Sequence, residues 1–280
     1  MSVEKDFLNH GFVKITIEKN LLNSISNLIF NFLKKKLNYK KSDSLFFFNN
    51  FHNLINISKL NEIRLEIINF LSSNPEFKKK IYLLVKKNLD EIVGNELVIQ
   101  KTLNLVIQLP KDESAILDLH ADTWGGNSPF EIVVWLPLVN CFKTKSMFIL
   151  DNNKNKKIIN KLENEFKKGK SISTEKLFQR IKKNITWLDV KYGEVILFNP
   201  ALPHGARKNL EKETRFSINC RFKGIFTPYG DKKIGEYFEP ITLKPMSKLG
   251  LKYFNEKKNI EVIFFQDLLM ERDFLSRCKI

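Results

Sequence analysis

The sequence predicts an α+β fold whose core is mainly β, an antiparallel sandwich or barrel of the jelly-roll kind preceded by helices. Two observations predict it. Apolar residues recur at helical spacing through most of the first third of the chain. From about residue 97 the pattern changes to short runs rich in Val, Ile, Leu, Phe and Trp, many of them separated by Gly, Pro or Asn. Many short strands in succession are typical of a sandwich or barrel.

The periodicity also predicts the individual elements. Residues 7–17 are expected to form a strand, and 19–36, 59–71 and 76–90 to form helices, the last beginning at Asn74-Pro75. The expected strands of the core are 97–109, 115–120, 130–138, 146–150, 185–189, 193–199 and 214–223. Residues 151–183, rich in Lys and Asn, are expected to form a helical insertion on the surface, and 231–280 to mix loop and helix.

With 280 residues and 43% apolar content, the chain can bury one sizeable core. We expect a single domain, with 1–96 as helical support, 97–230 as the β core and 231–280 as a C-terminal extension. No apolar run is long enough to span a membrane, and the acidic first residues do not form a signal peptide, so we expect a soluble cytoplasmic protein. Cys141, Cys220 and Cys278 are odd in number and far apart, which argues against a disulfide framework or a zinc site.

The formal charge of +16 is a weak indication of function. Among the 47 basic residues only 7 are Arg, and the lysines are spread over the whole length alongside abundant Asn, Ile and Phe. Proteins that read bases favour Arg, so the composition does not favour nucleic acid as a partner. A positive surface instead favours an anionic small-molecule substrate.

Three residues are candidate metal ligands. His120 and Asp122 form His-Ala-Asp directly after an apolar run, and His204 follows another apolar run. Residues two apart on an extended chain project to the same side, so one imidazole and one carboxylate can bind one metal. Two His and one carboxylate leave coordination positions open, as in non-haem iron(II) oxygenases. By themselves, His120 and Asp122 are also explained by a plain hydrogen-bonded pair. His10 and His52 have no partner at ligand spacing and are not expected to act.

The segment 214–222 alternates between two kinds of residue. One face carries Arg215, Ser217, Asn219 and Arg221, whereas the other is apolar. A solvated strand face would show the same pattern. However, this chain uses Lys for ordinary surface charge, and two of its few arginines on one face indicate a planar partner such as a carboxylate.

In order and spacing, these residues resemble the 2-oxoglutarate oxygenases of the double-stranded β-helix fold: His-x-Asp, a long gap, His, then eleven residues later Arg followed by x-Ser. Residues 7–13 and the segment His204-Gly-Ala-x-x-Asn209 further resemble the phytanoyl-CoA dioxygenase branch, and more narrowly oxygenases of bacterial surface-carbohydrate gene clusters. The resemblance covers about residues 100–223. The gap before His204 is longer than is usual for the family, and the insertion 151–183 accounts for the excess.

The resemblance implies Fe(II), 2-oxoglutarate and O2, with His120, Asp122 and His204 as the iron ligands. It implies that Arg215 pairs with the distal carboxylate of 2-oxoglutarate and that Ser217 supplies a hydroxyl. It also implies oxidative decarboxylation to succinate and carbon dioxide, followed by oxidation of the substrate. Because halogenating relatives lack the carboxylate ligand, its presence favours hydroxylation or a related oxidation.

Weaker candidates lie around this set. If one face of 103–109 lines the barrel, Asn104 and Gln108 can donate hydrogen bonds to the co-substrate or the substrate; the alternative is a wet edge strand. Further candidate pocket residues are Trp124, Glu131, Trp135, Arg207 and Arg221. Two other functions stay open: a cupin-type metal enzyme without 2-oxoglutarate, and a non-enzymatic basic binding protein.

Overall fold

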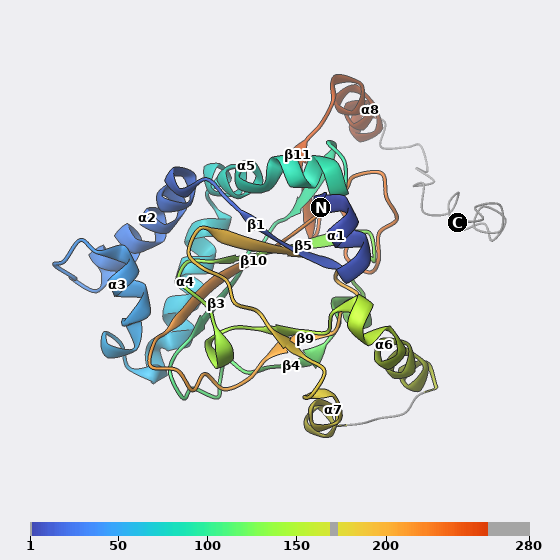
Figure 1. Cartoon of the computed structure of the whole chain (residues 1–280). Helices are drawn as coiled ribbons and strands as arrows, with labels where there is room; N and C mark the ends of the chain where they lie inside the picture. Colours follow the sequence, from blue (N-terminus) through green and yellow to red (C-terminus); the bar gives the residue numbers. More distant parts are fainter. Residues whose placement is uncertain (1, 169–172, 257–280) are drawn as a thin grey trace.

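The structure is a computed structural model that describes residues 2–168 and 173–256. Two antiparallel sheets form separate layers (Figure 1). The larger sheet has the order β1-β8-β5-β10-β2-β11, with β3 also paired to β10, and the smaller has the order β4-β9-β6-β7. The first comprises β1 (Phe12–Thr16), β8 (Glu194–Phe198), β5 (Glu131–Pro137), β10 (Arg215–Gly224), β2 (Leu97–Gln100), β3 (Asn104–Gln108) and β11 (Phe238–Thr242). The second comprises β4 (Leu117–His120), β9 (His204–Ala206), β6 (Phe148–Ile149) and β7 (Thr186–Trp187).

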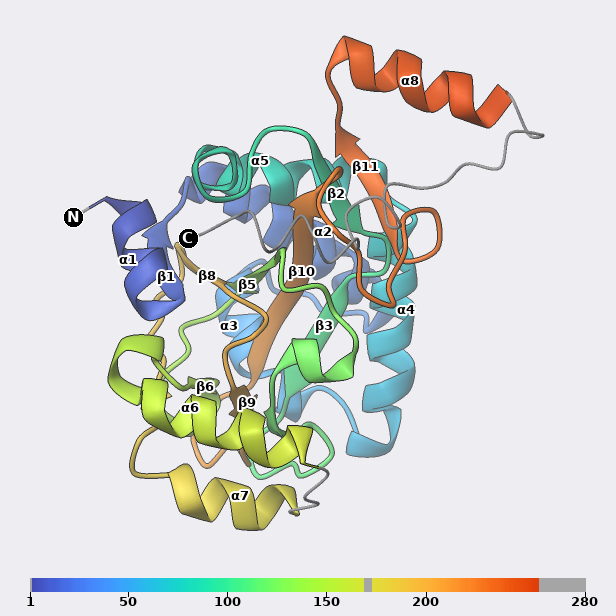
Figure 2. The same cartoon turned by 90° about the vertical axis from the view of Figure 1, so that its right-hand side faces the viewer.

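Helices cover both layers (Figures 1 and 2). Those preceding the core are α1 (Val3–His10), α2 (Lys19–Lys36), α3 (Ser44–Asn49), α4 (Leu60–Ser72) and α5 (Pro75–Ile92), with the short turns η1 (Phe51–Asn53) and η2 (Ile57–Lys59). The later ones are η3 (Asp122–Gly125), η4 (Lys143–Lys145), α6 (Asn152–Lys167), α7 (Thr174–Ile181) and α8 (Pro245–Glu256). In the described ranges, no helix is long and apolar enough to cross a membrane.

The two faces of the long strand β10 have different surroundings, one packed in the apolar core and the other lined with polar residues. Its apolar residues Phe216, Ile218, Cys220 and Phe222 are fully buried. They face the helices that precede the core: the Phe216 ring lies 4.8 Å from that of Phe48, and the Phe222 ring lies 6.4 Å from that of Tyr82. This burial of aromatic area against one side of the sheet fixes the register of the strand, because a slip by one residue would turn its arginines into the core.

Most predicted elements are confirmed. The helix 19–36 is α2, and α5 begins at Pro75 with the Asn74 side chain accepting from the backbone N–H of Phe77. The range 97–109 is two strands, β2 and β3, and the insertion 151–183 contains α6 and α7. Its apolar residues Ile159, Leu162, Leu177 and Ile181 are buried, so the insertion packs on the body rather than lying wholly on the surface.

Two predictions at the ends of the chain are wrong. Residues 7–10 are not a strand: they complete α1, which Ser2 caps at its start and Gly11 ends in a left-handed conformation with φ 74°. Only Phe12–Thr16 is extended. The extension after residue 231, expected to be loop and helix, also contributes β11, which pairs with β2 at the edge of the larger sheet. Residues 257–280, including Cys278, lie outside the described ranges. Cys141 and Cys220 are free and buried.

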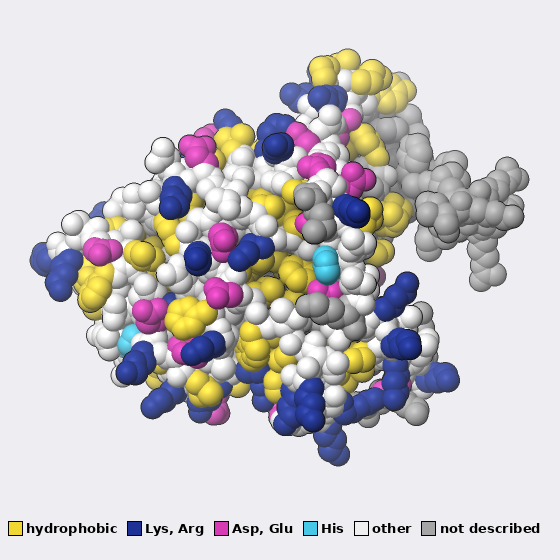
Figure 3. All heavy atoms as spheres, in the orientation of Figure 1, with side chains coloured by type: hydrophobic (Ala, Val, Ile, Leu, Met, Phe, Trp, Pro, Cys, Tyr) yellow, Lys and Arg dark blue, Asp and Glu magenta, His cyan; other side chains and the backbone are white. Residues whose placement is uncertain are grey.

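Basic residues are numerous on the face of the molecule drawn in Figure 3. In the face drawn in Figure 3, Lys and Arg lie on every part of the molecule with Asp and Glu among them, and they are densest over α6 and α7.

Candidate metal centre

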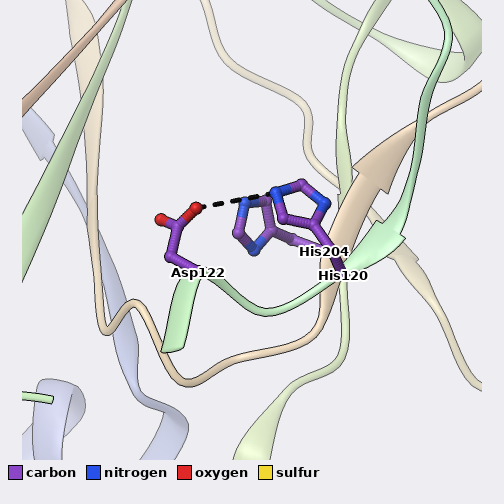
Figure 4. A group of neighbouring side chains, drawn as sticks. All are labelled: His120, Asp122 and His204. Atoms are coloured by element: carbon purple, nitrogen blue, oxygen red, sulfur yellow. Dashed lines mark ion pairs between the residues drawn. The ribbon is translucent and has the colours of Figure 1, made fainter. Parts of the chain in front are cut away.

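His120, Asp122 and His204 lie together and could hold a metal ion (Figure 4). One ligand atom from each can be chosen so that all three lie within 4.8 Å of one another. The Nε2 atom of His120 is 3.6 Å from Oδ1 of Asp122, and the two imidazole rings are 4.3 Å apart between centroids. The three residues that the sequence singled out thus converge, although His204 is far from the other two along the chain.

The pairing of β4 with β9 brings the two histidines together. His120 and His204 are directly opposite each other in the register of the smaller sheet. Gly205 permits the close approach, since a Cβ there would lie 2.7 Å from the backbone oxygen of Leu117 and 2.8 Å from the Phe148 ring. Asp122 follows His120 at the first residue of η3, where the chain leaves the sheet and turns toward the interior.

Backbone carbonyls orient both imidazoles. The Nδ1 atom of His120 is 2.8 Å from the carbonyl oxygen of Asp118, and that of His204 is 2.8 Å from the carbonyl oxygen of Leu202. A carbonyl can only accept, so each Nδ1 carries a proton, and in the neutral form of each ring Nε2 has the lone pair that a metal would take. Burial, with a contribution from the neighbouring His120, lowers the pKa of His204 to about 4, so this ring is neutral at physiological pH.

His120 and Asp122 have opposite pKa shifts. Burial lowers the pKa of His120, but the adjacent Asp122 carboxylate and the hydrogen bond to the Asp118 carbonyl outweigh burial and raise it. Burial raises the pKa of Asp122, but the adjacent His120 ring and the charge of Arg221 outweigh burial and hold that pKa well below its usual range. The Nη2 atom of Arg221 lies 2.8 Å from Oδ1 of Asp122. Asp122 is therefore a buried but ionised carboxylate, suited to a cation.

Arg215 lies on the same face of β10 as Arg221 and is 3% exposed. Its Nη1 donates to the carbonyl oxygen of Ser146 at 2.9 Å, and its Nε has no hydrogen-bond partner in the described part of the chain. Burial lowers its pKa to about 10, which still leaves it charged at neutral pH. Among the described residues, no carboxylate lies within ion-pair distance of this guanidinium. A buried cation without a counter-ion is costly, so this site suits an anionic ligand.

The solvated-face interpretation of β10 is wrong, because both arginines are buried. Because β3 pairs directly with β10, the polar residues of the two strands lie on one face of the sheet: Gln108 is opposite Arg215, and Asn104 is opposite Asn219. The Nε2 atom of Gln108 donates to the Arg207 carbonyl at 2.7 Å, and Asn104 is exposed.

Buried polar atoms without a hydrogen-bond partner among the described residues gather around the polar face of β10: Gln108 Oε1, Asp122 Oδ2, Ser146 Oγ, Arg215 Nε, Ser217 Oγ, Asn219 Oδ1 and Arg221 Nε. Such groups are normally satisfied, so the set indicates a polar ligand.

The other candidates divide into two groups. Glu131 and Trp135 lie opposite residues of the polar face of β10, and Glu131 is close to Arg221. Arg207 instead forms an ion pair with Glu175 at 2.6 Å and stacks over the Phe178 ring, so it ties α7 to the body. Trp124 is half-buried within η3.

Two histidines and one asparagine have partners elsewhere. His10 pairs with Asp151 at 2.8 Å, and His52 with the Thr214 hydroxyl at 2.9 Å, and neither belongs to the group that could hold a metal. The Asn209 amide donates to the Glu213 carbonyl at 2.8 Å and accepts from the Glu211 N–H. Asn209 therefore shapes the turn between β9 and β10.

Sequence reasoning missed Ser146, Tyr237 and Gln100, which contact the two arginines. Ser146 precedes the strand β6, and Tyr237 lies in the loop between β10 and β11. No sequence signal singled them out, because their proximity depends on pairings between distant strands.

The fold matches that of known non-heme enzymes. A non-heme monooxygenase, ThoJ, superposes in its nickel complex with a TM-score of 0.56 over 88% of this chain and 86% of that chain, at 10% identity. Its apo form gives a TM-score of 0.57. The non-heme alpha ketoglutarate dependent carbocyclase SnoK from nogalamycin biosynthesis gives 0.52 over 86% of this chain and 97% of that one, also at 10% identity. No protein-family model and no curated protein sequence matches the chain. At this identity, the likeness shows a shared fold.

Proposed function

We propose that the protein is an Fe(II)- and 2-oxoglutarate-dependent oxygenase built on a double-stranded β-helix and acting on a small molecule. The observation that carries the proposal is the buried guanidinium of Arg215, which has no counter-ion among the described residues. It lies on the strand face whose other arginine, Arg221, contacts Asp122 of the His120–Asp122–His204 group. A metal site alone does not need such an arginine, whereas a site for a metal-bound dicarboxylate does.

The residues present fit the metal. Two imidazoles that offer Nε2 when neutral and one ionised carboxylate suit Fe(II), and three protein ligands leave positions for co-substrate and dioxygen. When bound, iron with 2-oxoglutarate and dioxygen would supply oxidative decarboxylation and a strong oxidant for the substrate. The protein holds the ligands in place: the Asp118 and Leu202 carbonyls set the ring orientations, and Arg221 holds the carboxylate.

The co-substrate would lie along β10. Arg215 would pair with the distal carboxylate through two parallel hydrogen bonds, and the unpartnered Ser217 hydroxyl would donate a further one. Gln108, opposite Arg215, borders this end of the face, although its amide nitrogen already donates to the Arg207 carbonyl. Asn104 is exposed near the opposite end of β3, which favours a role toward substrate rather than co-substrate.

The finer assignment is hydroxylation, supported by the retained carboxylate ligand Asp122. The His204-Gly-Ala-x-x-Asn209 segment supports an affinity with the phytanoyl-CoA dioxygenase branch. The excess of basic residues supports an anionic substrate, such as a sugar nucleotide or a lipid phosphate, and a place in surface-carbohydrate or lipid metabolism. We further propose that the chain acts as one domain in the cytoplasm.

An anaerobic titration tests the proposal. Wild-type protein with Fe(II) is titrated with 2-oxoglutarate, and binding is followed by visible absorption and by calorimetry. We expect saturable 2-oxoglutarate binding that requires the metal. Arg215→Met should bind Fe(II) normally and lose 2-oxoglutarate affinity by about 30-fold or more, as expected for one partner of a buried charge pair. Metal binding with no 2-oxoglutarate binding in the wild type would contradict the proposal and favour a cupin-type enzyme.

A further inference from the structure

Arg221 occupies a position between two carboxylates. Its Nη2 is 2.8 Å from Oδ1 of Asp122, and its Nε is 3.8 Å from Oε2 of Glu131. Its Nη1 donates to Oε1 of Gln100 at 3.2 Å and to the Tyr237 hydroxyl at 3.4 Å. The residue is 8% exposed, so four groups hold it inside the protein. A planar guanidinium can contact several acceptors at once in fixed directions, which a lysine ammonium cannot.

Glu131, one of the carboxylate partners of Arg221, is itself held in place by hydrogen bonds. Glu131 is fully buried as a side chain and accepts from the Asn127 amide at 2.7 Å and from the Ser128 N–H at 2.8 Å. These bonds belong to the segment that follows η3, the turn that carries Asp122. Asp122 and Glu131, the two carboxylate partners of Arg221, therefore belong to one continuous segment, 122–131, which runs through η3 and the following loop to the start of β5.

The segment after β10 packs against this loop. We call residues 225–237, between β10 and β11, the support loop. The Ser128 hydroxyl donates to the Pro228 carbonyl at 2.6 Å, and the backbone N–H of Asp231 donates to the Gly126 carbonyl at 3.0 Å. A Cβ on Gly230 would lie 2.4 Å from the Gly126 oxygen, so the two backbones are in direct contact. Tyr237 ends the support loop and contacts Arg221.

We propose that Arg221 is a positioning residue: it fixes the Asp122 carboxylate for metal binding, and the support loop fixes Arg221 through Tyr237. This inference rests on the proposed function, and it gives the chain after residue 224 a role at the metal centre. Arg215 and Arg221 then have separate tasks on one strand. The first is left free for a dicarboxylate, and the second is committed to a metal ligand.

The test measures metal affinity without turnover. Wild type, Arg221→Met and Arg221→Lys are titrated with Co(II) in the absence of 2-oxoglutarate, and affinity and the visible Co(II) spectrum are recorded. We expect both variants to bind Co(II) at least tenfold more weakly, the usual effect of losing an outer-sphere partner, with an altered spectrum. Arg221→Lys should not rescue binding, because the role depends on directed contacts and not on charge alone.

A matched control is Arg180→Met, which removes an arginine whose Nη1 and Nη2 bond Glu165 at 3.0 and 3.1 Å, away from the metal candidates. It should leave Co(II) affinity and spectrum unchanged. Wild-type affinity in both Arg221 variants, or full rescue by lysine, would overturn the inference. If Arg221→Met does not fold, Arg221→Lys decides, because it keeps the charge and most of the stem. Absence of Co(II) binding by the wild type would instead contradict the proposed function.

Discussion

Arg215 and Arg221 lie on the same face of one strand, yet only Arg221 has carboxylate partners. Arg221 is 2.8 Å from Asp122 and 3.8 Å from Glu131, whereas Arg215 bonds only the Ser146 carbonyl among the described residues. This difference separates an arginine that stabilises the fold from one that lowers stability until a ligand arrives.

Arg215→Met is expected to raise the free energy of unfolding of the ligand-free protein by about 1–3 kcal/mol, because an apolar side chain replaces a buried charge without a counter-ion. Urea unfolding of wild type and variant without metal or co-substrate measures the difference. Arg64→Met, which removes an arginine bonded to the Asn61 side chain on the surface of α4, should change stability by less than about 0.5 kcal/mol. A less stable Arg215→Met protein would show that the guanidinium is compensated.

His204→Ala is expected to abolish stabilisation by metal. At a Ni(II) concentration one hundred times the dissociation constant, the wild type should gain about 2.7 kcal/mol in unfolding free energy, and the variant should gain nothing. Unfolding curves with Ni(II) and with a chelator measure this. The control is His10→Ala, which removes a histidine paired with Asp151 and should retain the full effect. Equal stabilisation of His204→Ala would place the metal elsewhere.

Gly205→Ala should separate the two strands that carry the histidines. The added methyl would lie 2.7 Å from the Leu117 carbonyl and 2.8 Å from the Phe148 ring, so β4 and β9 must move apart. We expect a loss of about 1–3 kcal/mol in stability and weaker Ni(II) binding. Gly125→Ala, where the new methyl would meet no atom within 4 Å, is the control. Unchanged Ni(II) affinity in Gly205→Ala would show that the ladder tolerates the insertion.

Lys223 makes stability depend on pH. Its side chain is fully buried and donates to the carbonyls of Gly224 and Thr227, and burial lowers its pKa from 10.5 to about 7. Between these values the unfolded chain binds more protons than the folded protein, so the free energy of unfolding rises with pH. Relative to Lys223→Met, the wild type should gain roughly 1 kcal/mol per pH unit from pH 7 to 9.

Urea unfolding at pH 7, 8 and 9 measures this difference. Other titrating groups are common to both proteins and cancel in the comparison. Lys79→Met, which removes an exposed lysine of α5, should show the same pH dependence as the wild type. Parallel curves for Lys223→Met and wild type would mean that Lys223 keeps its proton across this range.

The sequence predicts best where the signal is local. Alternation in 214–222 identified both faces of β10, and the scarcity of arginine marked the polar face as unusual. Asn74-Pro75 gave the start of α5 because capping acts within one turn. Helix α1 was missed although its signals, Ser2 and Gly11, were present, because the apolar residues nearby also fit a strand. Strand β11 contains Pro240, which an edge strand tolerates and a central strand does not.

The candidate site could be predicted as a list of residues but not as an arrangement. His120, Asp122, His204 and Arg215 followed from residue type, order and resemblance. The contact between Asp122 and Arg221 did not, because it depends on how the loop after β4 meets the larger sheet. The same is true of Tyr237 and Gln100, which reach Arg221 from strands and loops distant along the chain.

The opposed imidazoles of β4 and β9 have a consequence for the order of events in folding. A cation bound to both would cross-link two short strands that enclose α6 and α7 in one closed segment of chain. Unlike a disulfide, such a bridge exists only in the folded arrangement, so the free energy of metal binding adds to the stability of the folded protein. Metal binding would thus require that the smaller sheet has assembled, and a chain synthesised without metal would lack this stabilisation of β4 and β9.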